Sequence, residues 1–395
     1  MNPVAIISDN FGPYHLARLR AAAGTCDLLA IEIAGRSATY AWDASSGAES
    51  FRRETLIEAG TSAEVPRGEV GRRLGPALER FNPAVVVVPG WASPAAWAAM
   101  QWCTQRRVAM VCMSESTSYD ETPAAWKRML KSRLVRLFSA AFVGGQRHVE
   151  NLTQLGFAAE RISFGYDAVD NDYFSTNVEA TSANADETRR QLKLPAEFFL
   201  ASARFVEKKN LERLLEAFAR YRNGGGTWSL VLLGDGPLRP ALEKRRDELG
   251  LGAHVLMPGF RQYAELPAYY ALAGAFIHAS LVEPWGLVVN EAAASGLPLL
   301  VSNRCGCAPE LVRDGVNGFT FDPTNVHALA THMETVAAPD FPRAAFAAAS
   351  RETVAPWGPG RFAQGLAQAI DTALAHAPTR ANMIDRNLLS FLARR

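Results

Sequence analysis

Two glutamates flank a Pro-Trp-Gly step in the stretch SLVEPWGLVVNEAAASG, residues 280–296. Glu283 and Glu291 are eight positions apart, and eight helical residues would span roughly 12 Å. That is wider than the roughly 5–9.5 Å between the paired carboxylates of glycoside hydrolases, so the spacing disfavours an acid–base couple. Carboxylates also accept hydrogen bonds from vicinal sugar hydroxyls. The pair therefore favours two hydroxyl-bearing groups with an anion between them, which is the order of groups in a nucleotide sugar.

The residues around this step could hold that anion. Gly286 lets the backbone approach a ligand, and the first-turn amides of Gly286, Leu287 and Val288 lack helical partners, which makes a natural anion site. Arg204 and Lys209 follow another apolar run, at the start of a helical pattern where cations oppose the helix dipole unless an anion lies between them. Solvated surface charges and chance glutamates remain the alternative for each feature taken alone.

Two glycine-containing stretches follow further apolar runs. In LLGDGP (232–237), Gly234 and Gly236 permit either a close ligand approach or a simple strand-to-helix turn. In MPGFR (257–261), the backbone after Gly259 could lie along a flat base. Neither stretch identifies a ligand alone.

The elements that must position these residues are predicted by short, almost wholly apolar runs, each followed by Gly, Ser or Asp and then a helical pattern. Continuous hydrophobicity is typical of strands buried on both faces of a parallel sheet, and two sets of six predict two similar α/β lobes. Ligands of open parallel sheets bind beyond the carboxyl ends of the strands, where the residues above fall. The runs are 4–9, 28–34, 84–90, 108–114, 140–145 and 162–167, then 198–205, 229–236, 254–260, 274–280, 297–303 and 318–322.

One polar stretch predicts the division between the lobes. Residues 177–190, NVEATSANADETRR, contain few large apolar residues and indicate a linker or a surface loop leading into a short helix. We therefore expect an N-terminal lobe over 1–175 and a C-terminal lobe over 176–355, followed by helices over 356–395.

Composition narrows the class of protein. A formal net charge of +1 disfavours nucleic-acid binding by bulk electrostatics. No run approaches the roughly 18 apolar residues of a membrane span, and the start MNPVAIISDNFG lacks the features of a signal peptide, so a cytoplasmic location is expected. Cys305 and Cys307 could begin a metal site, but no further cluster completes four ligands, and we expect neither a metal nor another cofactor.

The second half resembles the retaining glycosyltransferases of family four, which have the two-lobed GT-B fold, and its motifs occur in that family's order. The resemblance is dense over 200–325 and is carried by ARFVEKKNLERLLEAF, LVLLGDGP, MPGF, AYYALAGAFIHASLVEPWGLVVNEAAASGLPLLVSN and APELVRDGVNGFTFD. In the first half it is looser and rests on SDNFGPYHLARL, GGQRHVENLTQLGFAAERI and YDAVDNDYF. It implies two Rossmann-like lobes whose parallel sheets face each other across a cleft, with the helices of 356–395 returning to the first lobe.

The resemblance also implies roles for individual residues. Arg204 and Lys209 would hold the donor diphosphate, together with the amides of Gly286 and Leu287. Glu283 would contact the donor sugar near the reacting carbon, either positioning it or acting as the nucleophile.

Glu291 would hold the ribose, and Gly259, Phe260 and Arg261 would line the base. Asn210 departs from the family pattern, because a glycine usually follows the lysine there. This replacement should not abolish phosphate binding.

In the first lobe, Gly12 would close on the diphosphate and His15 could reach the same cleft. Many relatives carry a histidine after the fourth strand of this lobe, where this chain has Ser114 and Glu115. The departure puts a histidine contact to the sugar in doubt, and Glu115 or Ser116 could contact the sugar or the acceptor instead.

A basic segment over 124–138, AAWKRMLKSRLVRLF, interleaves five cations with large apolar residues. It could lie on the anionic inner face of the cell membrane and meet a lipid-linked acceptor. It could equally be an ordinary amphipathic helix that covers the sheet and leaves its cations in solvent.

The leading hypothesis is a metal-independent, retaining transfer of a sugar from a nucleotide-diphosphate donor, with UDP favoured, to a saccharide, lipid-linked or small-molecule acceptor. A nucleotide-sugar epimerase or a phosphorylase on the same fold is one rival, and a catalytically silent nucleotide-sugar-binding protein is another. A dehydrogenase is disfavoured because SDNFGPYH, after the first strand, lacks the Gly-x-Gly-x-x-Gly pattern.

Overall fold

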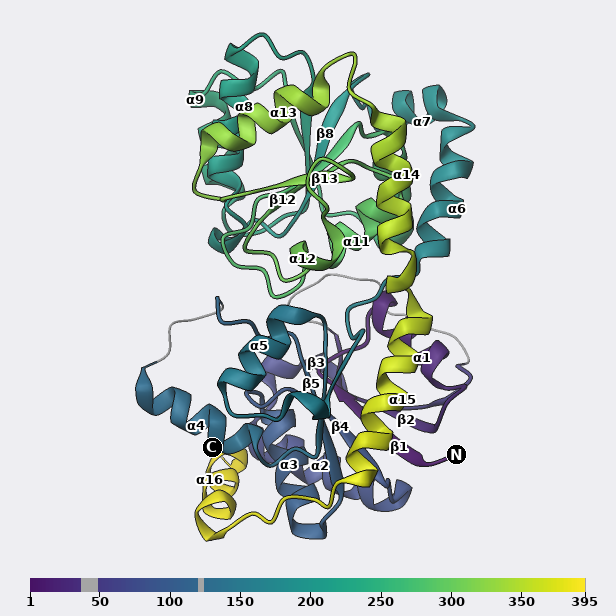
Figure 1. Ribbon diagram of the computed structural model, residues 1–395, viewed down its shortest axis with the longest axis vertical. Coiled ribbons are helices and arrows are strands. Elements are labelled where there is room, and N and C mark those ends of the chain that lie inside the picture. Colours follow the sequence, from purple (N-terminus) through teal and green to yellow (C-terminus); the bar gives the residue numbers. More distant parts are fainter. Residues whose placement is uncertain (37–48, 120–123, 395) are drawn as a thin grey trace. The chain divides into compact units, whose positions relative to one another are not determined.

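The computed structural model describes residues 1–36, 49–119 and 124–394 of the chain. Two compact units form, Met1–Val169 with Pro359–Arg395, and Asp170–Gly358. Each unit is built on its own parallel sheet, with helices on both faces (Figure 1).

The first unit contains a seven-stranded parallel sheet of order β3-β2-β1-β4-β5-β6-β7. Six strands coincide with predicted runs, but β3 does not, so the prediction of six strands is wrong for this unit. β3 pairs only with β2 at the edge of the sheet, where a strand needs few apolar residues, and it is fixed partly by ion pairs of Arg52 with Asp27 and Arg53 with Glu32. The strands are β1 (Pro3–Ser8), β2 (Asp27–Arg36), β3 (Arg52–Thr61), β4 (Val85–Pro89), β5 (Ala109–Ser114), β6 (Ala140–Val143) and β7 (Ile162–Phe164).

Helices from both ends of the chain cover this first sheet. α15 (Pro359–Ala375) packs against α1 (Pro13–Ala22), and α16 (Met383–Arg394) packs against α3 (Pro94–Arg106). The C-terminal helices thus belong to the first unit. The others are α2 (Arg67–Phe81), α4 (Ala125–Val135) and α5 (Gln146–Gln154), with single 3₁₀ turns at η1 (Ser62–Glu64) and η2 (Ala159–Arg161).

The second unit contains a six-stranded parallel sheet of order β10-β9-β8-β11-β12-β13. All six strands predicted for this half are confirmed. Because β8 and β11 are parallel neighbours, the loops that follow them emerge side by side at the carboxyl ends of the strands. The strands are β8 (Phe198–Ser202), β9 (Ser229–Leu233), β10 (Val255–Gly259), β11 (Ala275–His278), β12 (Leu299–Ser302) and β13 (Gly318–Phe321).

The polar stretch 177–190 is not the division between the units, and it is helical apart from a turn at 183–184, so the predicted linker or loop is wrong, whereas the short helix predicted after a loop is confirmed by α7 (Ala185–Leu192). The stretch contains the end of α6 (Asn171–Ser182) and most of α7, and the chain enters this unit earlier, at Asp170. The other helices are α8 (Leu211–Asn223), α9 (Arg239–Glu248), α10 (Leu266–Leu272), α11 (Leu287–Ala294), α12 (Ala308–Leu311), α13 (Val326–Ala337) and α14 (Arg343–Val354), with 3₁₀ turns η3 (Glu207–Lys209), η4 (Tyr263–Glu265) and η5 (Ala355–Trp357).

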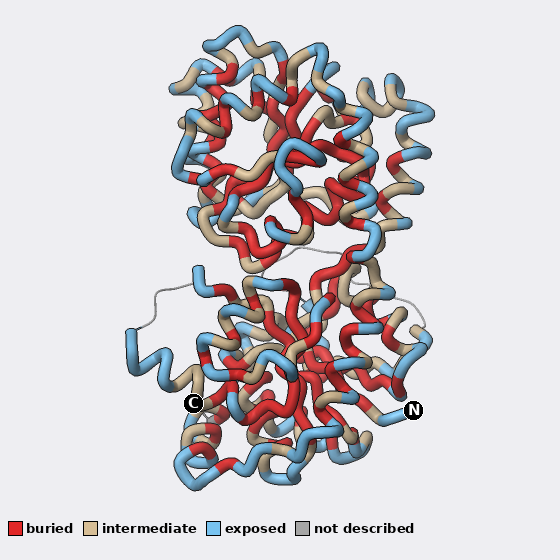
Figure 2. The backbone as a smooth tube through the Cα atoms, viewed as in Figure 1, coloured by how far each residue is buried: buried red, intermediate tan, exposed pale blue. Residues whose placement is uncertain are grey.

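The strands of both sheets form the centres of their units (Figure 2). Side chains on both faces of one strand are buried, as with Val86 and Val87 in β4 and Phe199 and Leu200 in β8. Burial on both faces explains why the apolar runs are continuous rather than alternating.

Candidate functional site

The loops that follow β8 and β11 are hydrogen-bonded to each other. The Leu281 amide donates to the Lys208 carbonyl at 2.8 Å. The Asn210 side chain donates to the carbonyls of Ala279 (3.0 Å) and Pro323 (2.8 Å). Asn210 also has a φ of +57°, a left-handed conformation that asparagine adopts more readily than most residues. The replacement of glycine at this position therefore preserves the turn and adds three side-chain hydrogen bonds, because Asn210 Oδ1 also accepts from the Arg213 guanidinium at 3.0 Å.

Glu283 is the centre of a buried polar cluster on these loops. Its Oε2 atom accepts hydrogen bonds from His278 Nε2 (2.8 Å) and Ser280 Oγ (3.1 Å), and it pairs with the Lys209 ammonium. The side chains of Glu283 and Lys209 are only 10% and 12% exposed. Within the described part of the chain, all of these contacts fall on Oε2 and no hydrogen bond reaches Oε1. The second carboxylate oxygen can therefore accept a ligand hydroxyl.

The electrostatics of this cluster fix its charge state. Burial alone would raise the pKa of the Glu283 carboxyl, but the Lys209 ammonium and the His278 ring together hold that pKa well below its usual range. Burial lowers the pKa of His278 despite the neighbouring carboxylate, so the imidazole is neutral at pH 7 and donates through Nε2. An ionised carboxylate only accepts hydrogen bonds, which suits the grip of sugar hydroxyls rather than proton donation.

Arg204 stands beside this cluster in sequence but outside its hydrogen bonds. It lies in the loop after β8 and is partly exposed, and its guanidinium forms neither an ion pair nor a hydrogen bond within the described residues. Gly286 has a φ of +104°, and a Cβ there would lie 3.3 Å from Glu283 Cγ. α11 begins at Leu287, immediately after that glycine. Arg204, which has no carboxylate partner among the described residues, and the amino end of α11 thus both lie beyond the carboxyl ends of neighbouring strands. This arrangement suits the binding of an anion.

Glu291 lies inside α11 and is completely buried. The Tyr270 hydroxyl donates a 2.8 Å hydrogen bond to Glu291 Oε2. Burial and the Glu291 charge raise the pKa of Tyr270 well above its usual range, so the tyrosine remains a donor. Glu291 is therefore not an exposed helical residue. Its role at a ribose stays a prediction.

The glycines after β9 serve the protein's own packing. A Cβ on Gly234 would lie 1.9 Å from the Ala203 carbonyl oxygen, and one on Gly236 would lie 2.7 Å from the Phe205 carbonyl oxygen. The backbone of the neighbouring loop, rather than a ligand, therefore requires both glycines.

Gly259 is the last residue of β10, the edge strand of the sheet, and Phe260 and Arg261 follow it. Gly259 has a φ of +94°. The Arg261 guanidinium donates to the Pro258 carbonyl at 3.1 Å and lies 5.6 Å from the centre of the Tyr269 ring. These contacts fix the arginine, and the predicted contact of this segment with a base stays a prediction.

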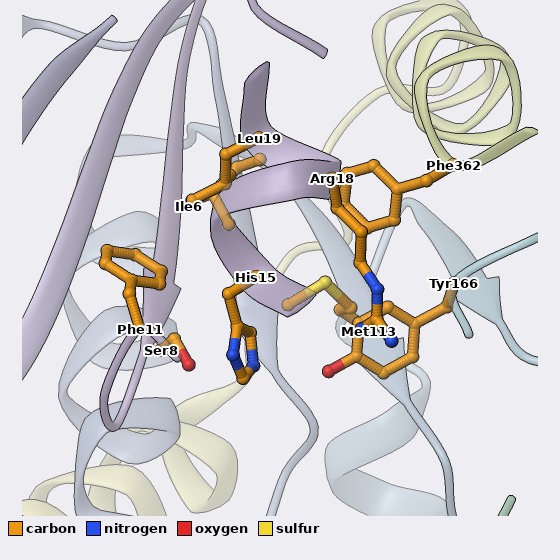
Figure 3. A pocket seen from close by; sticks show the side chains of 9 residues that line it. All are labelled: Ile6, Ser8, Phe11, His15, Arg18, Leu19, Met113, Tyr166 and Phe362. Carbon is orange, nitrogen blue, oxygen red and sulfur yellow. The ribbon is translucent and has the colours of Figure 1, made fainter. Parts of the chain in front are cut away.

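In the first unit, a small cavity lies beyond the carboxyl ends of β1 and β5 (Figure 3). The Gly12 amide donates to His15 Nδ1 at 3.3 Å, which leaves the ring proton on Nε2. Burial and the Arg18 charge lower the pKa of His15 to about 3, so the ring is neutral. The predicted contact of Gly12 with a diphosphate would have to replace this hydrogen bond. The cavity is lined by Ile6, Ser8, Phe11, His15, Arg18, Leu19, Met113, Tyr166 and Phe362.

Glu115 reaches this cavity through Tyr166. The Tyr166 hydroxyl is hydrogen-bonded to the Glu115 side chain, and burial together with the Glu115 charge raises the pKa of Tyr166. Ser116 is fixed in its own loop, because its amide donates to Ser114 Oγ at 3.2 Å. The structure thus links Glu115, through Tyr166, to the cavity that His15 also lines, whereas Ser116 shows no such link.

Four residues of the two sites are not predicted from the sequence: His278, Ser280, Tyr270 and Tyr166. One signal for the first two is the stretch FIHAS, in which polar residues end an otherwise apolar strand at the edge where ligands bind. The tyrosines carry no comparable signal, because their partners come from distant parts of the chain.

Two sequence features bear on metals and membranes: the pair Cys305 and Cys307, and the lack of a long apolar run. Cys305 and Cys307 are buried, and the backbone between them is bonded to the glutamate loop, with Gly306 N donating to the Glu283 carbonyl at 2.9 Å. Across the described ranges, no group of three His, Cys, Asp or Glu side chains is placed to hold a metal ion. Over the same ranges, no helix combines the length and apolar character needed to cross a bilayer.

Most of the second unit matches a known protein family. Residues 184–353 match the family described as glycosyl transferases group 1. The GDP-mannose-dependent alpha-(1-6)-phosphatidylinositol monomannoside mannosyltransferase of Mycolicibacterium smegmatis is 34% identical over 156 residues, 38% of this chain and 41% of that protein. The alpha-monoglucosyldiacylglycerol synthase of Acholeplasma laidlawii is 31% identical over 144 residues, 36% of each chain. The chain therefore spans less than half the length of these relatives.

The fold is shared over a much longer span. The Anabaena protein HepE, solved in complex with UDP, gives a TM-score of 0.72 over 93% of this chain and 99% of its own, at 18% identity. At that identity the likeness concerns the fold alone, and it confirms the predicted class of two Rossmann-like lobes with parallel sheets.

Proposed function

We propose that the protein moves a sugar from a nucleoside-diphosphate sugar to an acceptor hydroxyl, with retention of configuration, and the match of residues 184–353 to the group 1 glycosyl transferases supports this. The observation that carries this proposal is the edge of the second sheet, where Arg204 without a carboxylate partner, the buried Lys209–Glu283 pair and the start of α11 lie on adjoining loops. UDP is the favoured nucleotide, and the UDP bound to HepE supports that choice.

Each group in the cluster has a proposed role. Arg204, Lys209 and the amides of Gly286 and Leu287 bind the diphosphate, and Glu283 accepts hydrogen bonds from the sugar through Oε1. Glu291 holds the ribose, with Tyr270 orienting its carboxylate.

The segment Gly259 to Arg261 contacts the base of the nucleotide. The acceptor binds the first unit, where His15 and Glu115 lie near one cavity and offer groups that hydrogen-bond a hydroxyl. A nucleotide-sugar donor also favours a cytoplasmic site of action.

The proposed chemistry places the growing charge on the diphosphate. The bond from the anomeric carbon to the phosphate oxygen breaks, the acceptor oxygen bonds to that carbon on the same face, and the acceptor proton passes to a leaving phosphate oxygen. Arg204, Lys209 and the α11 amides stabilise the charge where it develops, so the proposed reaction needs no metal ion. Glu283 positions the sugar, and it is also the candidate for a nucleophile on this unit.

Two linked experiments test the proposal. A thermal-shift screen of nucleoside diphosphates and their sugars identifies the donor, and incubation of the best radiolabelled donor with candidate acceptors measures transfer. We expect stabilisation by one nucleotide series and transfer that depends on the acceptor. Product formed from the donor alone, or only with added phosphate, would favour an epimerase or a phosphorylase. Stabilisation without turnover under any condition would favour a silent binding protein.

A further inference from the structure

The first half of α4 is an exposed helical segment. Residues 124–129 are all exposed, with Trp126 at 61% and Met129 at 72%, and the segment is exposed along its trace in Figure 2. Burial begins only near the other end, at Leu134 and Val135. The helix therefore covers the sheet only through its C-terminal half. Two large apolar side chains standing out from one helical turn mark an interaction surface more often than a solvated one.

This exposed half of α4, residues 124–129, is also positively charged. The sequence of α4 contains Lys127, Arg128, Lys131 and Arg133 and no acidic residue. Arg133 pairs with Asp385 of α16 at 2.7 Å, which neutralises the buried end.

The cations at the exposed end have no such partner. Lys127 lies 5.9 Å from the centre of the Trp126 ring, and Arg128 donates to the uncharged Gln154 carbonyl. Within the described residues, no carboxylate pairs with Lys127 or Arg128. Positive charge without a carboxylate partner among the described residues and exposed apolar area therefore occupy the same turn.

We propose that the exposed half of α4 docks on an anionic lipid bilayer. Tryptophan prefers the boundary between lipid headgroups and chains, and lysine and arginine beside it gain from anionic headgroups. A protein partner fits less well because of Lys127, since the cores of protein–protein interfaces are depleted of lysine, although they are enriched in tryptophan, methionine and arginine. This proposal goes beyond the transfer reaction and does not depend on the donor site.

Flotation of the purified full chain with lipid vesicles tests the proposal. We expect binding to vesicles that contain phosphatidylglycerol, little binding to pure phosphatidylcholine, and loss of binding as salt rises. Lys127→Gln with Arg128→Gln should lower the partition constant about thirtyfold, from the contribution of two cations near a charged surface. Trp126→Ser with Met129→Ser should lower it roughly tenfold or more.

Matched variants separate this surface from general charge and stickiness. Arg220→Gln with Lys244→Gln removes two exposed cations from the second unit, and Met383→Ser with Ile384→Ser removes apolar side chains that are 76% and 62% exposed on α16. Both controls should bind vesicles like the parent chain.

Three results would overturn the proposal. They are equal binding to neutral vesicles, an equal loss in either control, and a self-association in sedimentation velocity that the α4 substitutions abolish without any change in vesicle binding. Nucleotide stabilisation, measured on the same variants, should stay as in the parent, so failure here leaves the proposed transfer reaction standing.

Discussion

Replacing Glu283 by glutamine should weaken the binding of a nucleotide sugar but should not weaken the binding of the free nucleoside diphosphate. The substitution keeps the shape of the side chain but removes the charge that accepts from Lys209, His278 and Ser280. In the proposed complex Oε1 of Glu283 meets only the sugar. The nucleoside diphosphate has no group there, and it gains a Lys209 released from its carboxylate partner.

The size of the effect follows from the number of contacts. A hydrogen bond to a charged group contributes about 1.5–3 kcal/mol, and one such bond from a sugar hydroxyl to Oε1 corresponds to roughly 10–150-fold in Kd. Ser280→Ala removes only one of the three donors to Oε2, so it should cost less than about tenfold.

Isothermal titration calorimetry with the best nucleotide of the thermal-shift screen and its sugar measures both affinities on one protein. Glu291→Gln is the counterpart, because the ribose occurs in both ligands, and it should weaken both by a similar factor. The reasoning fails if Glu283→Gln weakens the two ligands equally, or if it changes neither affinity.

Three further substitutions probe the framework of the site. Asn210→Ala loses three side-chain hydrogen bonds and strains a left-handed residue, so urea unfolding should show a loss of about 3–4 kcal/mol. Asn210→Gly removes the same bonds without the strain and should lose less, and equal losses would contradict the conformational argument. The pKa of His278 is lowered in the folded chain, so below about pH 6.5 the unfolded chain binds a proton that the folded chain does not. The free energy of unfolding should therefore decrease as the pH is lowered, by up to about 1.4 kcal/mol per pH unit. His278→Asn should reduce that slope and the exposed His376→Asn should not, and an unchanged slope in His278→Asn would refute a buried neutral imidazole. Gly286→Ala forces a side chain into a φ of +104° beside Glu283, so it should lower unfolding free energy by about 1–2 kcal/mol and weaken nucleotide binding, and full retention of both would show that α11 can start elsewhere.

The fold could be predicted wherever strands are buried on both faces. A strand such as β8 must be apolar throughout, and that pattern is visible in the sequence. β3 escaped prediction because an edge strand is stabilised by backbone pairing and by ion pairs such as Arg53–Glu32, which leave no continuous apolar run. The end of α6 was not predicted because its last turns, 177–182, are mostly polar and bury only Val178, which gives them the composition of a loop.

The residues that belong to the site could be predicted better than the contacts that they make with one another. The sequence indicates that Arg204 and Lys209 act together on an anion, but in the structure Lys209 pairs with Glu283, 74 residues away. That pairing follows from β8 lying next to β11, an order of strands that local sequence patterns do not encode. His278 was missed for a related reason, since one histidine in an apolar strand carries no signal until its carboxylate partner is known.

A crystal structure of the full chain with the bound nucleoside diphosphate tests the central claim most directly. The account predicts the diphosphate within hydrogen-bond distance of Arg204 and Lys209 at the start of α11, with the ribose hydroxyls on Glu291. A nucleotide bound at any other place, with Arg204 still lacking an anionic partner, would contradict it.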